Sequence, residues 1–174
     1  MYLIKKRKKF LTNLLINKIC ELKNSYWHFG LKSNKNWFKK NVYKNDIHLL
    51  MFKDKNKTIL VGYTLLRKRK YFVNNRFGYY FYLDTIIIDK AFRGKKIGQL
   101  MMKQNNITIK KNKIPAFLIC NKRLINFYKL NKWKIIKKNY FKLSDHKIKN
   151  KYGMVFNFKK IKKGIKFYIK KSYG

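Results

Sequence analysis

The sequence predicts an α/β protein with a mixed, mostly antiparallel sheet of about six to seven strands and about four flanking helices. Three observations support this fold class. Apolar residues recur at helical spacing before residue 40, strand-like patterns follow as far as residue 88, and a strand–helix–strand unit spans residues 79–120.

Length and composition indicate a single domain over residues 1–174. Hydrophobic residues make up 46% of the chain and aromatic residues 17%, which is enough for one sizeable core. The chain has 1 Pro and 8 Gly, and no stretch rich in Ser, Gly or Pro separates its apolar segments. We therefore expect neither a flexible linker nor a second domain.

Two helices are predicted before the first long strand. In residues 8–24 the apolar side chains recur every three or four positions, which is typical of an amphipathic helix. Ser33 or Asn34 is predicted to cap a second, short helix that carries Trp37 and Phe38.

Three antiparallel strands are expected next. Aromatic and β-branched residues favour strands over residues 47–52, 58–66 and 77–88, with turns at residues 54–57 and around Asn74 and Asn75. A helix of about four turns should follow and end near Asn112. Pro115 then precedes the all-apolar run 116–120, which is typical of a strand buried on both faces.

The strand over residues 77–88 and the strand over 116–120 should be parallel, because the helix between them forms a right-handed crossover. A helix over residues 122–130 and strands over 133–136 and 154–158 complete the order ααβββαβαββ. The tail after about residue 160 alternates Lys with Ile, Phe and Tyr, and we expect either a last edge strand or disordered chain there.

The charge of the chain is strongly positive, with 46 Lys and Arg against 6 Asp and Glu and a net charge of +40. Such a field attracts RNA, DNA or an anionic membrane surface. Arg, the better reader of phosphate and guanine, occurs only at positions 7, 67, 69, 76, 93 and 123. We therefore interpret the excess of Lys, Asn, Ile, Tyr and Phe as the product of an extremely AT-rich genome. The basic runs 5–9 and 67–70 are then solvated surface, and any contact with nucleic acid is expected to be non-specific.

Cys20 and Cys120 lie far apart among apolar residues, without a CxxC pair or a His at metal-ligand spacing. They are predicted to be buried, reduced thiols, and no metal site is expected. The basic N-terminus leads into a segment interrupted by Asn and Lys, which favours an amphipathic helix over a signal peptide. Since no segment approaches the ~20 apolar residues that span a bilayer, we expect a cytoplasmic protein.

The turn after residue 88 carries the first chemical signal. It joins an apolar strand to a helix and contains Gly94 and Gly98. The backbone N–H groups at such a helix start lack partners and lie at the positive end of the helix dipole, so they bind phosphate. Glycine lets phosphate oxygens approach the backbone closely, and Arg93, Lys95 and Lys96 add positive charge.

Two segments, residues 83–98 and residues 121–133, together resemble the signatures of the GNAT N-acetyltransferase superfamily. Residues 83–98, LDTIIIDKAFRGKKIG, resemble its acetyl-CoA-binding motif, an apolar strand followed by a turn R/Q-x-x-G-x-G/A and a helix. Residues 121–133, NKRLINFYKLNKW, resemble its second signature N-x6-Y-x3-G-F. Lys96 stands where the family usually has the first Gly of the turn, and Lys132 and Trp133 replace the usual Gly-Phe pair. The resemblance is close over roughly residues 80–137, and the order of elements extends it over nearly the whole chain.

The resemblance implies a fold, an activity and a set of cofactor-binding residues. The chain should transfer an acetyl group from acetyl-CoA to a primary amine without a covalent enzyme intermediate. The strand end should pair with the pantetheine arm, the turn should bind the diphosphate, and the second signature should hold the splayed strand end. The residues implied are Ile86, Ile87, Ile88, Arg93, Gly94, Lys95, Lys96, Ile97, Gly98, Gln99, Asn121 and Tyr128.

Direct transfer needs an acid beside the departing thiolate and a base for the proton of the amine. Tyr128 is the candidate acid, because it lies seven residues after Asn121 as in the family signature. Asp84 is one candidate base, since a carboxylate in an apolar strand should be isolated, buried and raised in pKa. Alternation places it on the same face as Ile86 and Ile88, and a purely structural hydrogen bond is equally consistent with it.

The sequence offers other polar residues for the same roles. The pair Asp145 and His146 offers an alternative base, because the pKa of His suits proton transfer. His28 and His48 are interpreted as structural, and Asp89 as a turn residue.

The acceptor is expected to be a small primary amine, such as an amino sugar, an amino acid derivative or a polyamine. By resemblance it would bind over the splay between the strands that end at Ile88 and Cys120, with Trp27, Trp37 and Phe38 on one wall. A basic nucleic-acid-binding protein is the alternative, and so is an acetyltransferase acting on tRNA or ribosomal protein. A monomer or a homodimer is expected.

Overall fold

A computed structural model describes residues 1–73, 76–143, 151–158 and 167–169. The chain forms two compact units. The first contains Met1–Arg67 and Asp84–Asn105, and the second contains Lys68–Leu83 and Asn106–Lys171. The two longest strands, β3 and β4, each contribute residues to both units.

The predicted fold class is confirmed. In the described residues the strands form a seven-stranded mixed sheet of order β1-β2-β3-β4-β5-β8-β6 and a two-stranded sheet of β7 and β9. The strands are β1 (Tyr2–Arg7), β2 (Ile47–Phe52), β3 (Leu60–Val73), β4 (Arg76–Ile88), β5 (Ala116–Asn121), β6 (Lys134–Ile136), β7 (Phe141–Leu143), β8 (Lys151–Phe156) and β9 (Phe167–Ile169). The α-helices of the described residues are α1 (Asn13–Trp27), α2 (Leu31–Asn41), α3 (Ile97–Lys111) and α4 (Ile125–Leu130).

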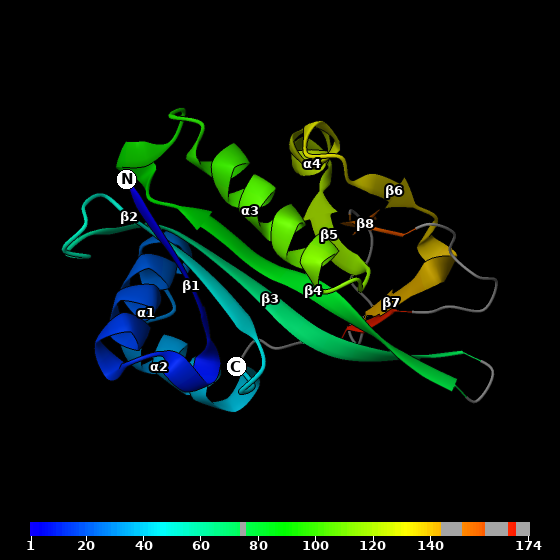
Figure 1. Ribbon diagram of the computed structural model, residues 1–174, viewed down its shortest axis with the longest axis horizontal. Helices are drawn as coiled ribbons and strands as arrows, with labels where there is room; N and C mark the ends of the chain where they lie inside the picture. The colour runs from blue at the N-terminus through cyan, green and yellow to red at the C-terminus, as the bar shows by residue number, and fades with distance from the viewer. Residues whose placement is uncertain (74–75, 144–150, 159–166, 170–174) are drawn as a thin grey trace. The chain divides into compact units, whose positions relative to one another are not determined.

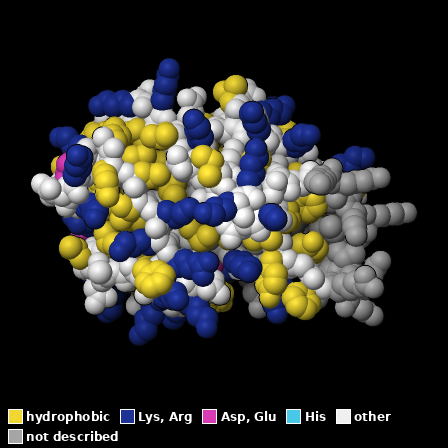
Figure 2. Space-filling view, viewed as in Figure 1, with side chains coloured by type: hydrophobic (Ala, Val, Ile, Leu, Met, Phe, Trp, Pro, Cys, Tyr) yellow, Lys and Arg dark blue, Asp and Glu magenta, His cyan; other side chains and the backbone are white. Residues whose placement is uncertain are grey.

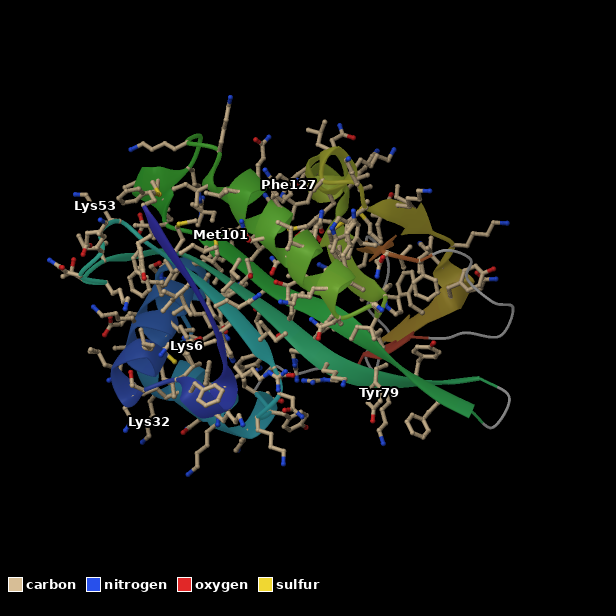
Figure 3. All side chains as sticks on the ribbon, viewed as in Figure 1. Lys6, Lys32, Lys53, Tyr79, Met101 and Phe127 are labelled. Atoms are coloured by element: carbon tan, nitrogen blue, oxygen red, sulfur yellow. The ribbon has the colours of Figure 1, made fainter. Side chains whose placement is uncertain are left out.

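In the first unit, helices cover both faces of the sheet (Figure 1). On one face α1 and α2 pack against Leu50, Phe52 and Ile87. On the other face the start of α3, with Met101 pointing at the strands in Figure 3, packs against their neighbours Leu49 and Met51. Successive strand residues thus point to opposite layers, as the twofold period of a strand requires.

The Met101 side chain of α3 packs directly over Gly62 in β3. A Cβ atom added at Gly62 would lie 2.6 Å from Met101 Sδ and 3.2 Å from Ile88 Cδ1. A side chain at this position would therefore require the Met101 side chain to move.

The helix starts differ in part from the sequence prediction. The Thr12 hydroxyl accepts from the backbone N–H of Leu15 at 3.3 Å and caps α1, which therefore begins later than predicted. The prediction of a cap at Ser33 or Asn34 was wrong, because Gly30 precedes α2 and both polar residues lie inside the helix. The Asn34 side chain instead donates to the Gly30 carbonyl at 3.0 Å.

Strand β1 was missed by the sequence analysis. Its Lys and Arg residues suggested solvated chain, yet the strand pairs along its full length with β2. Leu3 and Ile4 pack on opposite faces of the first unit. A lysine-rich strand at a sheet edge is typical of proteins, because charge there discourages pairing with a second chain.

In the second unit, β5 forms the buried centre. It pairs in parallel with β4 through Ala116 and Phe117, as the crossover predicted, and antiparallel with β8. Phe117, Phe141 and Val155 lie in one aromatic-rich core. β7 was not predicted, and it pairs in parallel with β9. An edge strand was one of the two alternatives for the tail; the rest of the tail lies outside the described residues.

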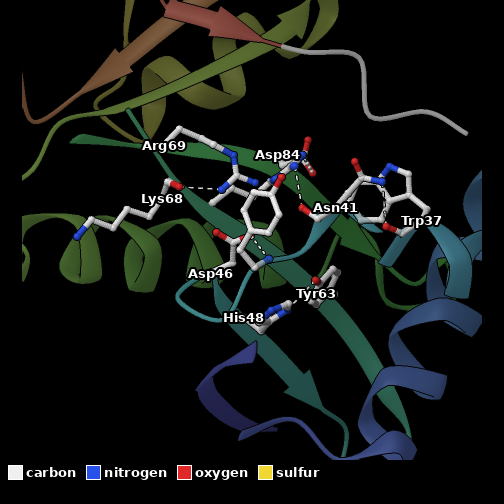
Figure 4. Close-up of polar contacts among 10 residues, drawn as sticks. Trp37, Asn41, Asp46, His48, Tyr63, Lys68, Arg69 and Asp84 are labelled. Atoms are coloured by element: carbon white, nitrogen blue, oxygen red, sulfur yellow. Dashed lines mark hydrogen bonds and ion pairs between the residues drawn. The ribbon is translucent and has the colours of Figure 1, made fainter. Parts of the chain in front are cut away.

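The interpretation of His48 as a structural residue is confirmed. Its side chain is fully buried in the first unit, and Nδ1 lies 2.9 Å from the Tyr63 hydroxyl (Figure 4). No described residue forms a hydrogen bond with Nε2. Burial lowers the pKa of His48 to about 3, with a smaller contribution in the same direction from Lys8. The folded protein therefore holds this imidazole neutral.

Acid should destabilise the protein through His48. Because its folded pKa lies below its ordinary value of 6.5, the stability of the neutral form is complete above pH 6.5 and is lost as the pH falls toward 3. The contribution of His48 to this loss should reach roughly 4 kcal/mol. Urea unfolding from pH 7 to 4 should show this slope in the wild type and a flatter one in His48→Leu. The exposed control His28→Asn should keep the wild-type slope, and an unchanged slope in His48→Leu would refute the assignment.

Candidate functional site

The connection from β4 to α3 is a short, ordered turn. Asp89 caps a single helical turn over Lys90–Phe92, its carboxylate accepting from the N–H of Ala91 at 2.9 Å. The Asp89 backbone N–H donates to the Val61 carbonyl at 2.9 Å, which attaches the turn to β3. Asp89 is thus a turn residue, as predicted.

Lys96 has a backbone conformation that favours glycine, the residue that the family usually has at this position. Its φ is 57°, in the left-handed region, and Gly94 two residues earlier has φ 77°. In the second unit Lys132, at the family's other missing glycine, has φ 67°. Both substitutions therefore keep the glycine geometry, at a cost of about 1 kcal/mol for a residue with a Cβ atom.

The start of α3 presents unsatisfied donors. The Lys96 carbonyl accepts from the Leu100 N–H at 3.1 Å and so begins the helix. Within the part of the chain that the structure describes, the N–H groups of Ile97, Gly98 and Gln99 have no acceptor. Arg93, Lys95 and Lys96 in the same turn are all exposed. Helix dipole, open amides and cations together fit a diphosphate.

The strand that leads to this turn supplies further predicted residues. Ile87 is buried toward α1 and α2, and Ile88 packs toward α3, whereas Ile86 is half-buried. The Ile88 carbonyl accepts from Arg93 Nε at 3.3 Å. The first unit thus brings the strand end and the turn together as the family motif requires.

Asp84 is not the isolated carboxylate that the sequence suggested. Its Oδ2 lies 3.3 Å from Arg67 Nη1, and the two side chains are 13% and 8% exposed. Arg67 Nη2 also donates to the Asn41 carbonyl of α2 at 2.8 Å, and Figure 4 shows Asn41 and Trp37 beside Asp84. The expectation that residues 67–70 are all solvated surface was therefore wrong at Arg67.

The predicted facing of Asp84 was also wrong. The side chains of Asp84 and Ile87 lie on the face of the sheet that α1 and α2 cover, whereas Ile88 faces α3. Residues three apart cannot share a face under strict alternation, so β4 is irregular between residues 84 and 87. Such irregularities are common beside functional sites because they redirect a side chain.

A cavity of about 240 Å³ opens next to Asp84. Helices α1 and α2 supply most of its lining. The predicted wall residues Trp27 and Trp37 belong to it, whereas Phe38 packs in the core instead. Its polar lining includes Lys23, Lys40, Asn41 and Asp84.

The second unit holds the remaining predicted residues. Asn121 ends β5, and its Oδ1 accepts from Lys151 Nζ of β8 at 2.7 Å. Tyr128 lies in α4, is 5% exposed, and its ring is 6.3 Å from the ring of Trp133. The Trp133 indole donates to Asn106 at 3.0 Å, which fixes the segment after α4. Asp145 and His146, the alternative candidates for the general base, lie outside the described residues.

Cysteine, metal and membrane features add no further site. Cys20 and Cys120 are free, buried thiols, as predicted, and burial raises the pKa of Cys120 to about 11. No cluster of His, Cys, Asp or Glu suitable for a metal ion occurs in residues 1–73, 76–143, 151–158 and 167–169. Over the same residues, no helix is both long and apolar enough to cross a bilayer.

Comparison with known proteins identifies the family. The chain belongs to the acetyltransferase (GNAT) family, whose model matches residues 16–131. Its reaction class is therefore acetyl transfer from acetyl-CoA to an amine nitrogen. No curated protein matches the sequence.

Solved structures share the fold at low sequence identity. An aminoglycoside 6'-N-acetyltransferase complexed with coenzyme A has a TM-score of 0.66 and 12% identity, covering 91% of this chain and 99% of that one. ElaA of Escherichia coli has a TM-score of 0.62 and 17% identity, covering 88% of this chain and 97% of that one. The ribosomal-protein-S18-alanine N-acetyltransferase of Escherichia coli has a TM-score of 0.59 and 13% identity, covering 88% of this chain and 92% of that one. These similarities concern the fold alone.

Sequence reasoning missed two polar residues of this region, Arg67 and Lys23. Arg67 follows an apolar strand segment and precedes a basic run, so its burial had no local signal. Lys23 is one of many lysines, yet it is only 6% exposed. In α1 it follows Ile19 by four residues, on the buried helix face, and that spacing was the available clue.

Restoring the family glycine at Lys96 should not harm the fold. Lys96→Gly removes the left-handed strain, whereas the control Lys95→Gly removes the same charge where φ is not positive. By urea unfolding, Lys96→Gly should be about 1 kcal/mol more stable than Lys95→Gly. Equal destabilisation by the two substitutions would show that residue 96 carries no strain.

Proposed function

We propose that the chain acetylates a small primary amine by direct transfer from acetyl-CoA, with both units forming one acetyltransferase domain. The observation that carries the proposal is the set of open amides at Ile97, Gly98 and Gln99, directly after β4, in a chain of this family. When bound, acetyl-CoA supplies a thioester carbon that an uncharged amine can attack.

The first unit would hold the cofactor. The backbone of Ile86, Ile87 and Ile88 would pair with the pantetheine arm, and the amides of residues 95–99 would bind the diphosphate. Arg93, Lys95 and Lys96 would neutralise part of its charge. In the second unit Asn121 would contact the pantetheine from the end of β5.

The proton transfers complete the reaction. As the new N–C bond forms and the C–S bond breaks, a base must take one proton from the amine and an acid must give one to the sulfur. We assign the acid to Tyr128. Asp84 and the pair Asp145–His146 remain the alternatives for the base. For Asp84 the role fits its place at the cavity, where the Arg67 pair holds the carboxylate in position.

The cavity beside Asp84 is the proposed acceptor site. Trp27 and Trp37 offer apolar walls, while Asn41 and Asp84 offer polar groups that could orient an amine. Small amines, including an amino sugar, fit its volume better than a folded protein does. A cytoplasmic monomer or homodimer is proposed with it.

A second candidate is an acetyltransferase, or a plain binding protein, that contacts RNA. Lys and Arg side chains are scattered over the face shown in Figure 2. In the second unit Lys68 Nζ lies 4.3 Å from the Tyr79 ring centroid and Lys70 Nζ lies 4.7 Å from that of Phe77. The two rings are 37% and 57% exposed, and cations over exposed rings are the ordinary platform for single-stranded nucleic acid.

Stabilisation by the cofactor separates the two candidates. Acetyl-CoA at about 100 times its Kd should add roughly 3 kcal/mol of stability and raise Tm by about 5 °C or more at 150 mM salt. Tripolyphosphate at the same concentration is the control for anions in general. No shift with acetyl-CoA, together with RNA affinity that falls steeply with salt, would favour the second candidate.

With an acceptor found by screening amines against labelled acetyl-CoA, Tyr128→Phe in the same assay tests the acid. It should lower kcat about 100-fold and leave the acetyl-CoA shift in Tm unchanged, because only proton donation is lost. Tyr140→Phe, another tyrosine of the second unit, should keep wild-type turnover. Normal turnover in Tyr128→Phe would remove this residue from the mechanism.

A further inference from the structure

Lys23 is an unusual residue in the cavity of the first unit. Its side chain is 6% exposed, and Nζ lies 3.4 Å from the centroid of the Trp37 ring and 5.8 Å from that of Trp27. In the described parts of the chain no group accepts a hydrogen bond from this ammonium or pairs with it as a carboxylate. Three N–H donors thus face two aromatic rings and the cavity.

Among the described residues this arrangement gives the ammonium no protein acceptor, and its N–H groups are open to the cavity. The aromatic rings compensate part of its lost hydration, but they cannot accept strong hydrogen bonds from three donors. Burial lowers the pKa of Lys23 to about 8, and the more distant Asp84 carboxylate opposes the shift. A ligand with an anionic group would supply the missing acceptors.

The other charges at the cavity favour the same ligand. Asp84 is engaged by Arg67 at 3.3 Å, and Lys40 on α2 adds a second cation to the lining. An acceptor that carries several positive charges would meet two lysines here. An acceptor with a carboxylate would be attracted by both, and its amine would be attracted by Asp84.

We propose that the acceptor is an amino acid-like molecule, a primary amine that carries a carboxylate bound by Lys23 and Lys40 and an apolar or aromatic body between Trp27 and Trp37. This inference rests on the proposed function, because it specifies the amine that the cavity receives. Aromatic walls around a buried cation select for such a molecule and against a polyamine.

The proposal implies a pH dependence of binding. The charged groups around Lys23 are Asp84 on β4, Arg67 on β3 and Lys40 on α2, with the Cys20 thiol on its own helix. Burial raises the pKa of Cys20, so it stays a thiol near pH 8. Above about pH 8 Lys23 loses its proton, and affinity for a carboxylate should fall.

Binding of 3-phenylpropionate to the full chain tests the inference without acetyl-CoA. This probe has the carboxylate and the ring but no amine, so its titration is simple. By calorimetry it should bind at least 10-fold more tightly than 3-phenylpropionamide at pH 7, and its affinity should fall about 10-fold between pH 7 and 9. Equal affinity of acid and amide would overturn the proposal.

Two variants assign the effect to the cavity. Lys23→Met keeps the length of the side chain and should weaken 3-phenylpropionate binding at least 10-fold and remove its pH dependence. Lys32→Met, an exposed lysine of α2 outside the cavity, should bind as the wild type does. Equal losses in both variants would overturn the proposal, and the comparison of acid with amide in the wild type decides the matter if Lys23→Met fails to fold.

Turnover separates this inference from the proposed function. Phenylalanine should be acetylated with a kcat/KM at least 10-fold above that of phenethylamine, which lacks the carboxylate. If acetyl-CoA stabilises the protein but phenethylamine is the better acceptor, the proposed function stands and the inference fails. If acetyl-CoA does not stabilise the protein, the proposed function itself fails, whatever 3-phenylpropionate does.

Discussion

The ion pair between Arg67 and Asp84 holds together the part of the fold that contains the cavity. The Arg67 guanidinium lies 3.3 Å from the Asp84 carboxylate and donates to the Asn41 carbonyl at 2.8 Å. It thereby joins β3, β4 and the C-terminal end of α2. Removing one partner of a buried pair leaves an uncompensated charge, which costs about 3–5 kcal/mol. The guanidinium also lies where α2 ends, and a cation is favourable at that end of a helix dipole. The pair thereby holds the Asp84 carboxylate at the cavity. The irregular stretch of β4 follows directly after this fixed residue.

The same strand leads into the proposed anion site, which depends on backbone rather than on side chains. Open amides at the start of α3 keep their direction as long as residues 94 and 96 keep left-handed φ values. Lys96 does so without being glycine, as Lys132 does at the other signature. A chain whose composition has moved so far toward lysine therefore keeps left-handed backbone at both positions. Its 40 excess positive charges strengthen the attraction of any anionic ligand, but they do not by themselves choose one.

Much of this fold was predictable, because local sequence patterns indicate most of its helices and strands. The change from alternating to helical periodicity after residue 88 predicted the turn and α3, and the spacing of Asn121 and Tyr128 predicted β5 and α4. β1 was missed since its basic residues mask the apolar pair Leu3 and Ile4. The aromatic wall of the cavity was predicted at Trp27 and Trp37. Its buried cations were not, because burial of Lys23 and Arg67 depends on helices and strands distant in sequence, and lysine is too common here to mark a site. Asp84 was found as a candidate but assigned to the wrong face, since alternation fails within β4.

The central claim is that the turn before α3 binds the diphosphate of acetyl-CoA through backbone amides. Amide ¹H–¹⁵N spectra of the labelled protein, titrated with CoA at physiological salt, test it most directly. The account predicts the largest shifts at residues 95–99, with downfield movement as new hydrogen bonds form, and small shifts at the basic surface elsewhere. Shifts spread evenly over the lysine-rich surface, with residues 95–99 unchanged, would contradict it.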